Sequence, residues 1–405
     1  MLRARPRFAL GFACGLMAGI LVLSAAGQRS AAAPYQELAI FSSVLRLVRE
    51  VYVEPVDEAL LVRAAVRGML ADLDPHSAYL DADANARLRE ATTGEFVGVG
   101  LEIGRGADGA LEVVAPLEGS PAARAGLRAR DRIVELCGTP CEPARGLDPD
   151  EAAARLRGPA GSAITLTVLR DGWKAPRAFA LTRGVVRAPA VRARRLEPGI
   201  GVARIAELSE GAARELAARI AQLERENGAP LRGLVLDLRS NPGGVVDEAV
   251  AVADLWLDSG EIVTLRGRSA EDSERFDATP GGDARLPLVV LVDGGSASAA
   301  EIVAAALQDQ RRALIVGETS YGKGSAQGVF ELPGGAGVRL TTARYTTPSG
   351  RALEGAGVTP DLPVAAAASG ASGDPQLARA VEALKSPGLF EALRASAPPA
   401  AQGPE

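Results

Sequence analysis

Residues 233–257 read GLVLDLRSNPGGVVDEAVAVADLWL, and they join an apolar run to a glycine turn and then to a second apolar pattern. The run Gly233–Leu238 is short and apolar except at Asp237, which is typical of a strand buried on both faces. The turn Asn241–Gly244 ends this run, and the spacing of apolar residues in Val246–Leu257 predicts a helix. A buried strand that leads directly into a helix is the unit of a layered α/β core with largely parallel strands.

The same alternation of strands and helices continues on both sides of this segment, after a linker around residues 183–198. Further strands are expected at 199–205, 288–292 and 314–316, and further helices at 209–227 and 299–308. We therefore assign residues 184–365 to one α/β domain. The remainder, 366–405, is rich in Ala, Pro and Gly, and it predicts one helix at 376–384 with a disordered tail.

The chain before residue 184 shows three different patterns. Residues 34–94 carry apolar side chains at helical spacing and predict a short helical region. Residues 95–183 contain short apolar runs separated by glycine turns, which predicts a small β-rich domain inserted ahead of the core. Residues 1–33 begin with the basic Met1–Arg7 and continue with the apolar Phe8–Ala26, so they form either a cleaved export signal or a retained membrane anchor. Either outcome places the rest of the protein outside the cytoplasm.

Composition excludes several classes of function. The chain of 405 residues is 47% hydrophobic, and its net charge of −5 provides no basic excess for phosphates, so we expect several cores and no nucleic-acid partner. Cys14 lies in the apolar N-terminal segment, and one histidine with two further cysteines is too few for the usual four ligands of zinc. We expect neither a metal nor a cofactor.

Cys137 and Cys141 flank a Gly-Thr-Pro turn and either form a disulfide or remain free thiols.

Lysine is rare among the 45 basic residues and occurs only at Lys174, Lys323 and Lys385. An arginine cannot act as a general base, whereas a desolvated lysine can lose its proton near neutral pH. Lys323 lies between two glycines, downstream of the sequence GSAS at 295–298, and this pairing points to Ser/Lys chemistry. Gln327 is a plausible hydrogen-bond partner that orients the amine. The single histidine, His76, lies in the helical N-terminal region, where we expect a structural role.

Ser298 begins the helix predicted at 299–308, and two interpretations of it can hold together. In the first, Ser298 caps the helix and Glu301 reaches back, as in a capping box. In the second, the hydroxyl is a nucleophile at the positive end of the helix, and the N–H of Ala299 helps to bind an oxyanion. The second oxyanion N–H is expected from Gly243 or Gly244, because glycine allows the backbone to approach a substrate carbonyl.

The β-rich domain resembles a PDZ domain in the loop Gly98–Leu101 and in GSPAARAGLRARDRIVELCG, residues 119–138. The resemblance implies that the backbone N–H groups of Val99, Gly100 and Leu101 receive the terminal carboxylate of a peptide, which pairs as an added strand. In some relatives a PDZ arginine couples the bound peptide to the active site. Arg157 is the candidate for this role here, and the alternative is a solvated turn residue.

Five separated motifs resemble those of the C-terminal processing peptidases, also called tail-specific proteases, over about residues 38–365. The motifs are LDPHSAYL (73–80), LDLRSNPGGV (236–245), VDGGSASAAEIVAAALQD (292–309), GETSYGKGSAQ (317–327) and ARYTTPSGRALEGAGVTPD (343–361). The resemblance implies a crotonase-like α/β protease core. It also implies that Ser298 is the nucleophile, Lys323 the base and Gln327 the third catalytic residue, with oxyanion donors at Ala299 and at Gly244 or Gly243.

We therefore expect an exported serine endopeptidase of the periplasm or cell envelope that recognises the C-termini of protein or peptide substrates. An adaptor protein, a membrane contact through the N-terminal segment and a homo-oligomer are further expected partners or states. One alternative is a PDZ adaptor or chaperone with an inactive protease body. The other is a crotonase-type enzyme acting on acyl-CoA, against which the export segment and the PDZ-like domain both argue.

Overall fold

The computed structural model describes residues 36–106, 108–137, 141–367, 373–386 and 388–389. The export segment predicted at residues 1–33 lies outside them, as do residues 390–405 of the predicted tail. In these described ranges, no helix is both long enough and apolar enough to cross a membrane. The chain divides into two compact units, residues 1–79 and 80–405.

The first unit is helical over most of its described length, as predicted. Residues 36–51 form one helix, and α2 spans Glu58–Ala71. Asp57 caps α2, because its carboxylate accepts hydrogen bonds from the N–H groups of the first helical turn. The backbone N–H of His76 donates to Asp74 Oδ1 at 2.7 Å. This bond stabilises the turn that follows α2, and the structural role of the His76 side chain stays a prediction.

The α/β core is built on a six-stranded sheet with the strand order β10-β11-β12-β15-β16-β19. Neighbouring strands from β11 to β19 are parallel, and β10 pairs antiparallel at the edge. The strands are Val191–Glu197 (β10), Ile200–Ile205 (β11), Gly233–Asp237 (β12), Leu288–Val292 (β15), Leu314–Gly317 (β16) and Leu362–Pro363 (β19). The linker predicted around 183–198 is wrong in part, because β9 (Gly184–Arg187) and β10 occupy it. Edge strands bury only part of their surface, so their many arginines concealed the strand pattern.

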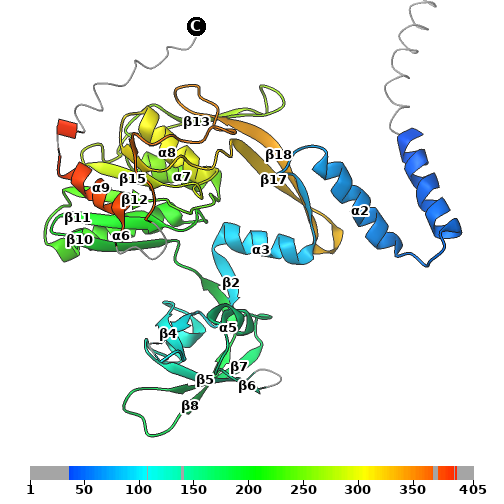
Figure 1. Cartoon of the computed structure of the whole chain (residues 1–405), viewed down its shortest axis with the longest axis horizontal. Helices are drawn as coiled ribbons and strands as arrows, with labels where there is room; N and C mark the ends of the chain where they lie inside the picture. The colour runs from blue at the N-terminus through cyan, green and yellow to red at the C-terminus, as the bar shows by residue number, and fades with distance from the viewer. Residues whose placement is uncertain (1–35, 107, 138–140, 368–372, 387, 390–405) are drawn as a thin grey trace, which may run out of the picture. The chain divides into compact units, whose positions relative to one another are not determined.

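Helices cover both faces of this sheet (Figure 1). Leu234 and Leu236 of β12 face one hydrophobic core, and Val235 between them faces the other. The first core also contains residues of α6 (Ala212–Asn227), α7 (Val246–Asp254) and α8 (Ala299–Asp309), and the second contains residues of α9 (Pro375–Leu384). The helix predicted at 376–384 is therefore part of the folded core, and it covers a face that would otherwise expose valine and leucine side chains to water.

A second, antiparallel sheet contains β13, β14, β17 and β18. Their bounds are Glu261–Arg266 (β13), Glu274–Asp277 (β14), Ser325–Glu331 (β17) and Gly337–Thr346 (β18), with the 3₁₀ turn η1 (Pro333–Gly335) between the last two. Strand β17 begins two residues after Lys323, so the β17–β18 hairpin carries one side of the predicted site. The helix α3 (Ala82–Thr93) holds the hairpin, because Asn85 Nδ2 and Arg89 Nη2 donate to the carboxylate of Glu331 at 3.1 and 2.5 Å.

The inserted domain is an antiparallel sheet with the order β3-β4-β5-β7-β8 and with β6 beside β5, and its hydrophobic core is separate from those of the α/β domain. Its elements are Leu101–Arg105 (β3), Leu111–Pro116 (β4), Pro121–Arg124 (α4), Arg132–Cys137 (β5), Cys141–Pro143 (β6), Pro149–Leu156 (α5), Ala163–Leu169 (β7) and Arg177–Thr182 (β8). Cys137 and Cys141 lie opposite each other and form a disulfide, with their Cα atoms 3.8 Å apart. The entering strand β2 (Glu95–Gly98) pairs with the leaving strand β9.

Candidate active site

The N-terminus of α8 presents Ser298 in a strained backbone conformation. Its φ of 57° is in the region that favours glycine, and a non-glycine residue stays there only when its surroundings hold it. Glu301 Oε2 accepts from the Ser298 N–H at 2.8 Å, and the Ser298 carbonyl accepts from the Glu301 N–H at 2.8 Å. Glu301 therefore reaches back to the start of the helix as the capping-box interpretation predicted, and this bond holds the backbone that carries the predicted nucleophile.

The other serine of the GSAS sequence, Ser296, is committed to structure. Its side chain is fully buried, and its hydroxyl donates to the Leu238 carbonyl at 2.8 Å. The same oxygen accepts from the Asp293 N–H at 2.9 Å. The first bond joins the end of β12 to the loop after β15, and the second lies within that loop, so Ser296 connects the segment before the glycine turn to the nucleophile loop.

The turn Asn241–Gly244 packs directly against the start of α8. A Cβ atom at Gly243 would lie 2.9 Å from Ser298 Cβ and 3.0 Å from the Ala299 nitrogen, so only glycine permits this approach. The buried side chain of Asn241 fixes the turn, since Nδ2 donates to the Ile205 carbonyl at 3.0 Å and Oδ1 accepts from the Gly243 N–H at 2.8 Å. The Gly243 N–H is thus occupied, which favours Gly244 of the two predicted glycines.

Lys323 lies in the loop between β16 and β17. Burial lowers the pKa of its ammonium group below the usual value, and the positive charge of Arg339 lowers it further. The carboxylates of Glu354 and Glu301 act in the opposite direction and raise the pKa. The net shift brings the amine closer to the neutral form that a general base needs.

One buried carboxylate joins the serine to the lysine loop. Glu301 Oε2 accepts from the backbone N–H groups of both Ser298 and Lys323, each at 2.8 Å. Glu301 Oε1 accepts from the Ser320 hydroxyl at 2.5 Å and from the Gly322 N–H at 2.7 Å. These four bonds satisfy a fully buried side chain, and they fix the two segments relative to each other. The sequence predicts only a capping role for Glu301, because nothing in the local pattern indicates its contacts with the lysine loop.

Tyr345 of β18 is a second residue that the sequence reasoning missed. Its hydroxyl lies 3.5 Å from Ser298 Oγ, and its side chain is almost completely buried. Burial raises the pKa of the phenol, so the hydroxyl remains neutral and keeps its proton. The residue belongs to the motif ARYTTPSG, but the motif alone gives no reason to prefer this side chain over its neighbours.

Gln327 lies on β17, and its amide group is held from the same hairpin. Its Nε2 donates to the carbonyl and hydroxyl of Ser325, at 3.2 and 3.1 Å, and to Thr341 Oγ1 at 3.3 Å. With the nitrogen used in this way, the amide oxygen is the part of Gln327 that can accept a hydrogen bond from an amine. This orientation suits the partner role predicted for the residue.

In the inserted domain, packing and a hydrogen bond hold the predicted peptide-binding loop. Val99 is fully buried, and Gly100 has a φ of 74° and faces Ser120, whose hydroxyl donates to the Gly100 carbonyl at 3.0 Å. Arg157 follows α5 and makes an ion pair with Glu90 of α3 at 3.1 Å, and its guanidinium lies 5.0 Å from the centre of the Phe96 ring. Arg157 therefore has two specific partners, although about half of its side chain is exposed.

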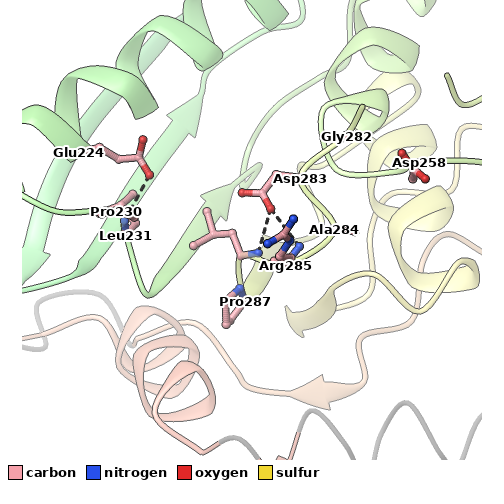
Figure 2. A pocket seen from close by; sticks show the side chains of 10 residues that line it. Glu224, Pro230, Leu231, Asp258, Gly282, Asp283, Ala284, Arg285 and Pro287 are labelled. Atoms are coloured by element: carbon pink, nitrogen blue, oxygen red, sulfur yellow. Dashed lines mark hydrogen bonds between the residues drawn. The ribbon is translucent and has the colours of Figure 1, made fainter. Parts of the chain in front are cut away.

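A cavity of about 630 Å³ lies away from these residues, between the end of α6 and the loop before β15 (Figure 2). Its acidic side chains already have backbone partners. Glu224 accepts from the Leu231 N–H, and Asp283 accepts from the N–H groups of Arg285 and Leu286. Neither Ser298 nor Lys323 lines this cavity, so its size does not make it the candidate active site.

Comparisons with known proteins agree with this architecture. The model of peptidase family S41 matches residues 199–364, a PDZ-domain model matches 112–170, and the model of the N-terminal domain of the activating protease CtpB matches 21–84. A carboxy-terminal-processing protease of Bartonella bacilliformis is 43% identical over 332 residues, which cover 82% of this chain and 75% of the relative. A carboxyl-terminal-processing protease of Synechocystis is 41% identical over 322 residues, covering 78% and 74%.

Among solved structures, a photosystem II D1 C-terminal processing protease is 34% identical and covers 79% of this chain and 85% of its own, with a TM-score of 0.43. The family matches define a class first, a serine-type peptidase of family S41 that carries a PDZ domain. Within that class, the chain belongs to the carboxy-terminal processing proteases. The predicted combination of an α/β protease core with an inserted PDZ domain is confirmed.

Proposed function

We propose that this protease is an exported endopeptidase that uses a Ser298–Lys323 dyad to cleave protein substrates at or near their C-termini. The observation that carries the proposal is the Glu301 carboxylate, which binds the backbone N–H groups of Ser298 and Lys323 through a single oxygen. Two loops that are far apart in the sequence are held together there, one with a hydroxyl and the other with a lysine of lowered pKa.

In this mechanism the neutral amine of Lys323 accepts the proton of Ser298 Oγ while that oxygen attacks the carbonyl carbon of the scissile peptide bond. The N–H groups of Gly244 and Ala299 bind the oxyanion, since the Gly243 N–H already donates to Asn241. The Lys323 ammonium then protonates the leaving amine. Gln327 orients the lysine through its amide oxygen.

Water completes the reaction by attacking the acyl-enzyme. Lys323 accepts a proton from the water and returns a proton to Ser298 Oγ as the ester bond breaks. An arginine at position 323 would retain the charge but could not accept a proton in either half of the cycle.

For substrate selection, we propose that the PDZ domain binds a free C-terminus, with the carboxylate on the N–H groups of Val99, Gly100 and Leu101. The names of the relatives, which refer to carboxy-terminal processing, support this assignment. The N-terminal sequence supports export to the periplasm or cell envelope, with residues 1–33 as a signal or a membrane anchor. We retain an adaptor protein and a homo-oligomer as further proposed partners.

The test compares Ser298→Ala, Lys323→Arg and Lys385→Arg in hydrolysis of an unstructured protein substrate. We expect the first two variants to lose hydrolysis while their circular dichroism and melting temperatures stay near those of the parent. Lys385→Arg is the matched control, because this exposed lysine pairs with Glu197 and an arginine can keep the ion pair. Hydrolysis by Lys323→Arg at more than a few per cent of the parent rate would refute the dyad.

The alternative function, a PDZ adaptor or chaperone with an inactive protease body, makes a different prediction. The parent itself would then leave the substrate uncleaved, and Ser298→Ala would be indistinguishable from it. Ser296→Ala distinguishes the two serines, because the buried Ser296 should lower stability when its hydroxyl is removed but should leave hydrolysis measurable.

A further inference from the structure

Tyr345 connects the two halves of the proposed dyad. Its backbone N–H donates to the carbonyl of Gly324, the residue after Lys323, at 2.8 Å. Its side-chain hydroxyl extends to the other half and lies 3.5 Å from Ser298 Oγ. The residue itself is fixed from a third side, because β18 pairs with β13 and places Tyr345 opposite Leu265. Tyr345 therefore has a defined position relative to both the lysine loop and the nucleophile.

The surroundings of the phenol limit what its hydroxyl can do. The side chain is 3% exposed, and a buried hydroxyl is costly unless it has a hydrogen-bond partner. In the described ranges of the chain, the partner found for this hydroxyl is Ser298 Oγ. Because burial also raises the pKa of the phenol, the hydroxyl keeps its proton and is able to donate a hydrogen bond.

We propose that Tyr345 is a further catalytic residue, whose hydroxyl donates a hydrogen bond to Ser298 Oγ. This inference rests on the proposed dyad. In the free enzyme, a bond donated to a lone pair of Oγ leaves the serine proton available to Lys323. A distance of 3.5 Å is long for a hydrogen bond, but catalytic contacts often shorten only when substrate is bound.

The largest effect is expected in deacylation. During acylation the bond from Oγ to the acyl carbon forms, the peptide C–N bond breaks, and Lys323 moves the serine proton to the leaving nitrogen. During deacylation a water oxygen bonds to the acyl carbon and the bond to Oγ breaks, so negative charge develops on Oγ before Lys323 returns a proton. A hydrogen bond from the phenol stabilises that departing oxygen, and Tyr345 keeps its own proton throughout.

A purely structural tyrosine would behave differently. If only the ring mattered, for its packing in the core, phenylalanine would replace Tyr345 without any kinetic effect. If the hydroxyl stabilises charge on Oγ, phenylalanine should slow deacylation more than acylation, so that kcat and KM for an ester substrate fall together while kcat/KM changes less.

The experiment is pre-steady-state hydrolysis of an activated peptide ester by the full chain with Tyr345→Phe. Hydrogen bonds to charged groups suggest a loss in the deacylation rate of about 10- to 100-fold. We expect a burst of ester cleavage and an acyl-enzyme on Ser298 that mass spectrometry detects at a higher level than in the parent. Tyr52→Phe is the control, since that tyrosine is exposed and its hydroxyl loss should change none of these rates.

Three outcomes separate this inference from the proposed function. Deacylation by Tyr345→Phe within twofold of the parent, with Ser298→Ala inactive, overturns the role of Tyr345 and leaves the dyad intact. Full activity of Ser298→Ala overturns the dyad itself.

If Tyr345→Phe does not fold, 3-fluorotyrosine at position 345 is the second variant. It keeps the side-chain volume and lowers the pKa of the phenol, so the pH at which the deacylation rate falls on the alkaline side should become lower. An unmoved alkaline limb would also overturn the proposal.

Discussion

The proposed catalytic cluster of the α/β core and the Arg157 contact of the PDZ domain use polar contacts in opposite environments. In the core, the Glu301 carboxylate is fully buried and accepts four hydrogen bonds. On the PDZ side, the Arg157 and Glu90 side chains are 52% and 36% exposed, and they share one ion pair. Water can replace the partners of the exposed Arg157–Glu90 pair at little cost in free energy, but it cannot reach the buried bonds of Glu301.

This difference predicts a hierarchy of mutational effects. Removing a partner from a buried polar network leaves groups without hydrogen bonds, at about 1–3 kcal/mol for each group. An exposed ion pair contributes about 0–1 kcal/mol and weakens further in salt. Substitutions in the cluster should therefore abolish function, whereas substitutions at the PDZ contact should only modulate it.

Glu301→Gln should have the largest effect. The amide has a single acceptor oxygen, and its NH₂ group would point at N–H donors that the carboxylate now satisfies. We expect a loss of at least about 100-fold in kcat, because displacement of the serine or lysine by about 1 Å is enough for that. We also expect a lower melting temperature.

Thermal unfolding and peptide hydrolysis measure both effects, with Glu271→Gln as a control at an exposed position. Parent-like stability together with parent-like activity in Glu301→Gln would show that the buried carboxylate does not organise the site.

The same comparison explains how much the sequence could predict. Ser298, Lys323 and the Pro-Gly-Gly turn lie at or near the ends of strands or helices, so local glycine and apolar patterns, the rarity of lysine and the family resemblance were enough to propose roles for them. Glu301 and Tyr345 act through contacts with segments 22 and 47 positions away, as in the bonds to Lys323 and Ser298. No local periodicity encodes such contacts. The β17–β18 hairpin was missed for a similar reason, since glycines and exposed apolar residues blur the alternation in β17.

Changes in the pH dependence of kcat/KM are the effect of intermediate size, and they test whether Lys323 is the titrating base. Lys323 must be neutral to accept a proton, so activity should rise with pH through the lowered pKa of its ammonium. Arg339→Gln removes a positive charge that lowers this pKa, and the acidic limb should move to higher pH. Glu354→Gln removes a negative charge that raises it, and the limb should move to lower pH.

Opposite shifts in the two variants would identify the titrating group as Lys323. His76→Ala is the control and should leave the limb unchanged, since the proposed base is Lys323 and not the histidine. A limb that moves with His76 and not with Arg339 or Glu354 would assign the base to the histidine.

The smallest effect is expected at the PDZ contact. Arg157 binds Glu90 on α3, and the same helix holds Glu331 of β17 through Asn85 and Arg89. These contacts link the PDZ domain to the strand that carries Gln327, and they are the route by which the proposed peptide capture would affect the site. For Arg157→Ala we expect a decrease of about two- to fivefold in cleavage of a protein with a free C-terminal tail, since an exposed pair contributes at most about 1 kcal/mol.

Arg157→Lys should restore much of this cleavage rate, because it keeps the positive charge next to Glu90 and Phe96. Arg128→Ala is the control for the loss of one exposed arginine on the same domain. The difference in cleavage rate between Arg157→Ala and the parent should shrink in high salt.

Amidating the C-terminus of the substrate removes the carboxylate that the Gly98–Leu101 loop is proposed to bind, so the parent rate should fall to the Arg157→Ala level. A faster rate in Arg157→Ala would mean that the domain restrains the protease. Equal rates on free and amidated tails would mean that the PDZ domain does not select C-termini, and the function of the core would then be independent of it.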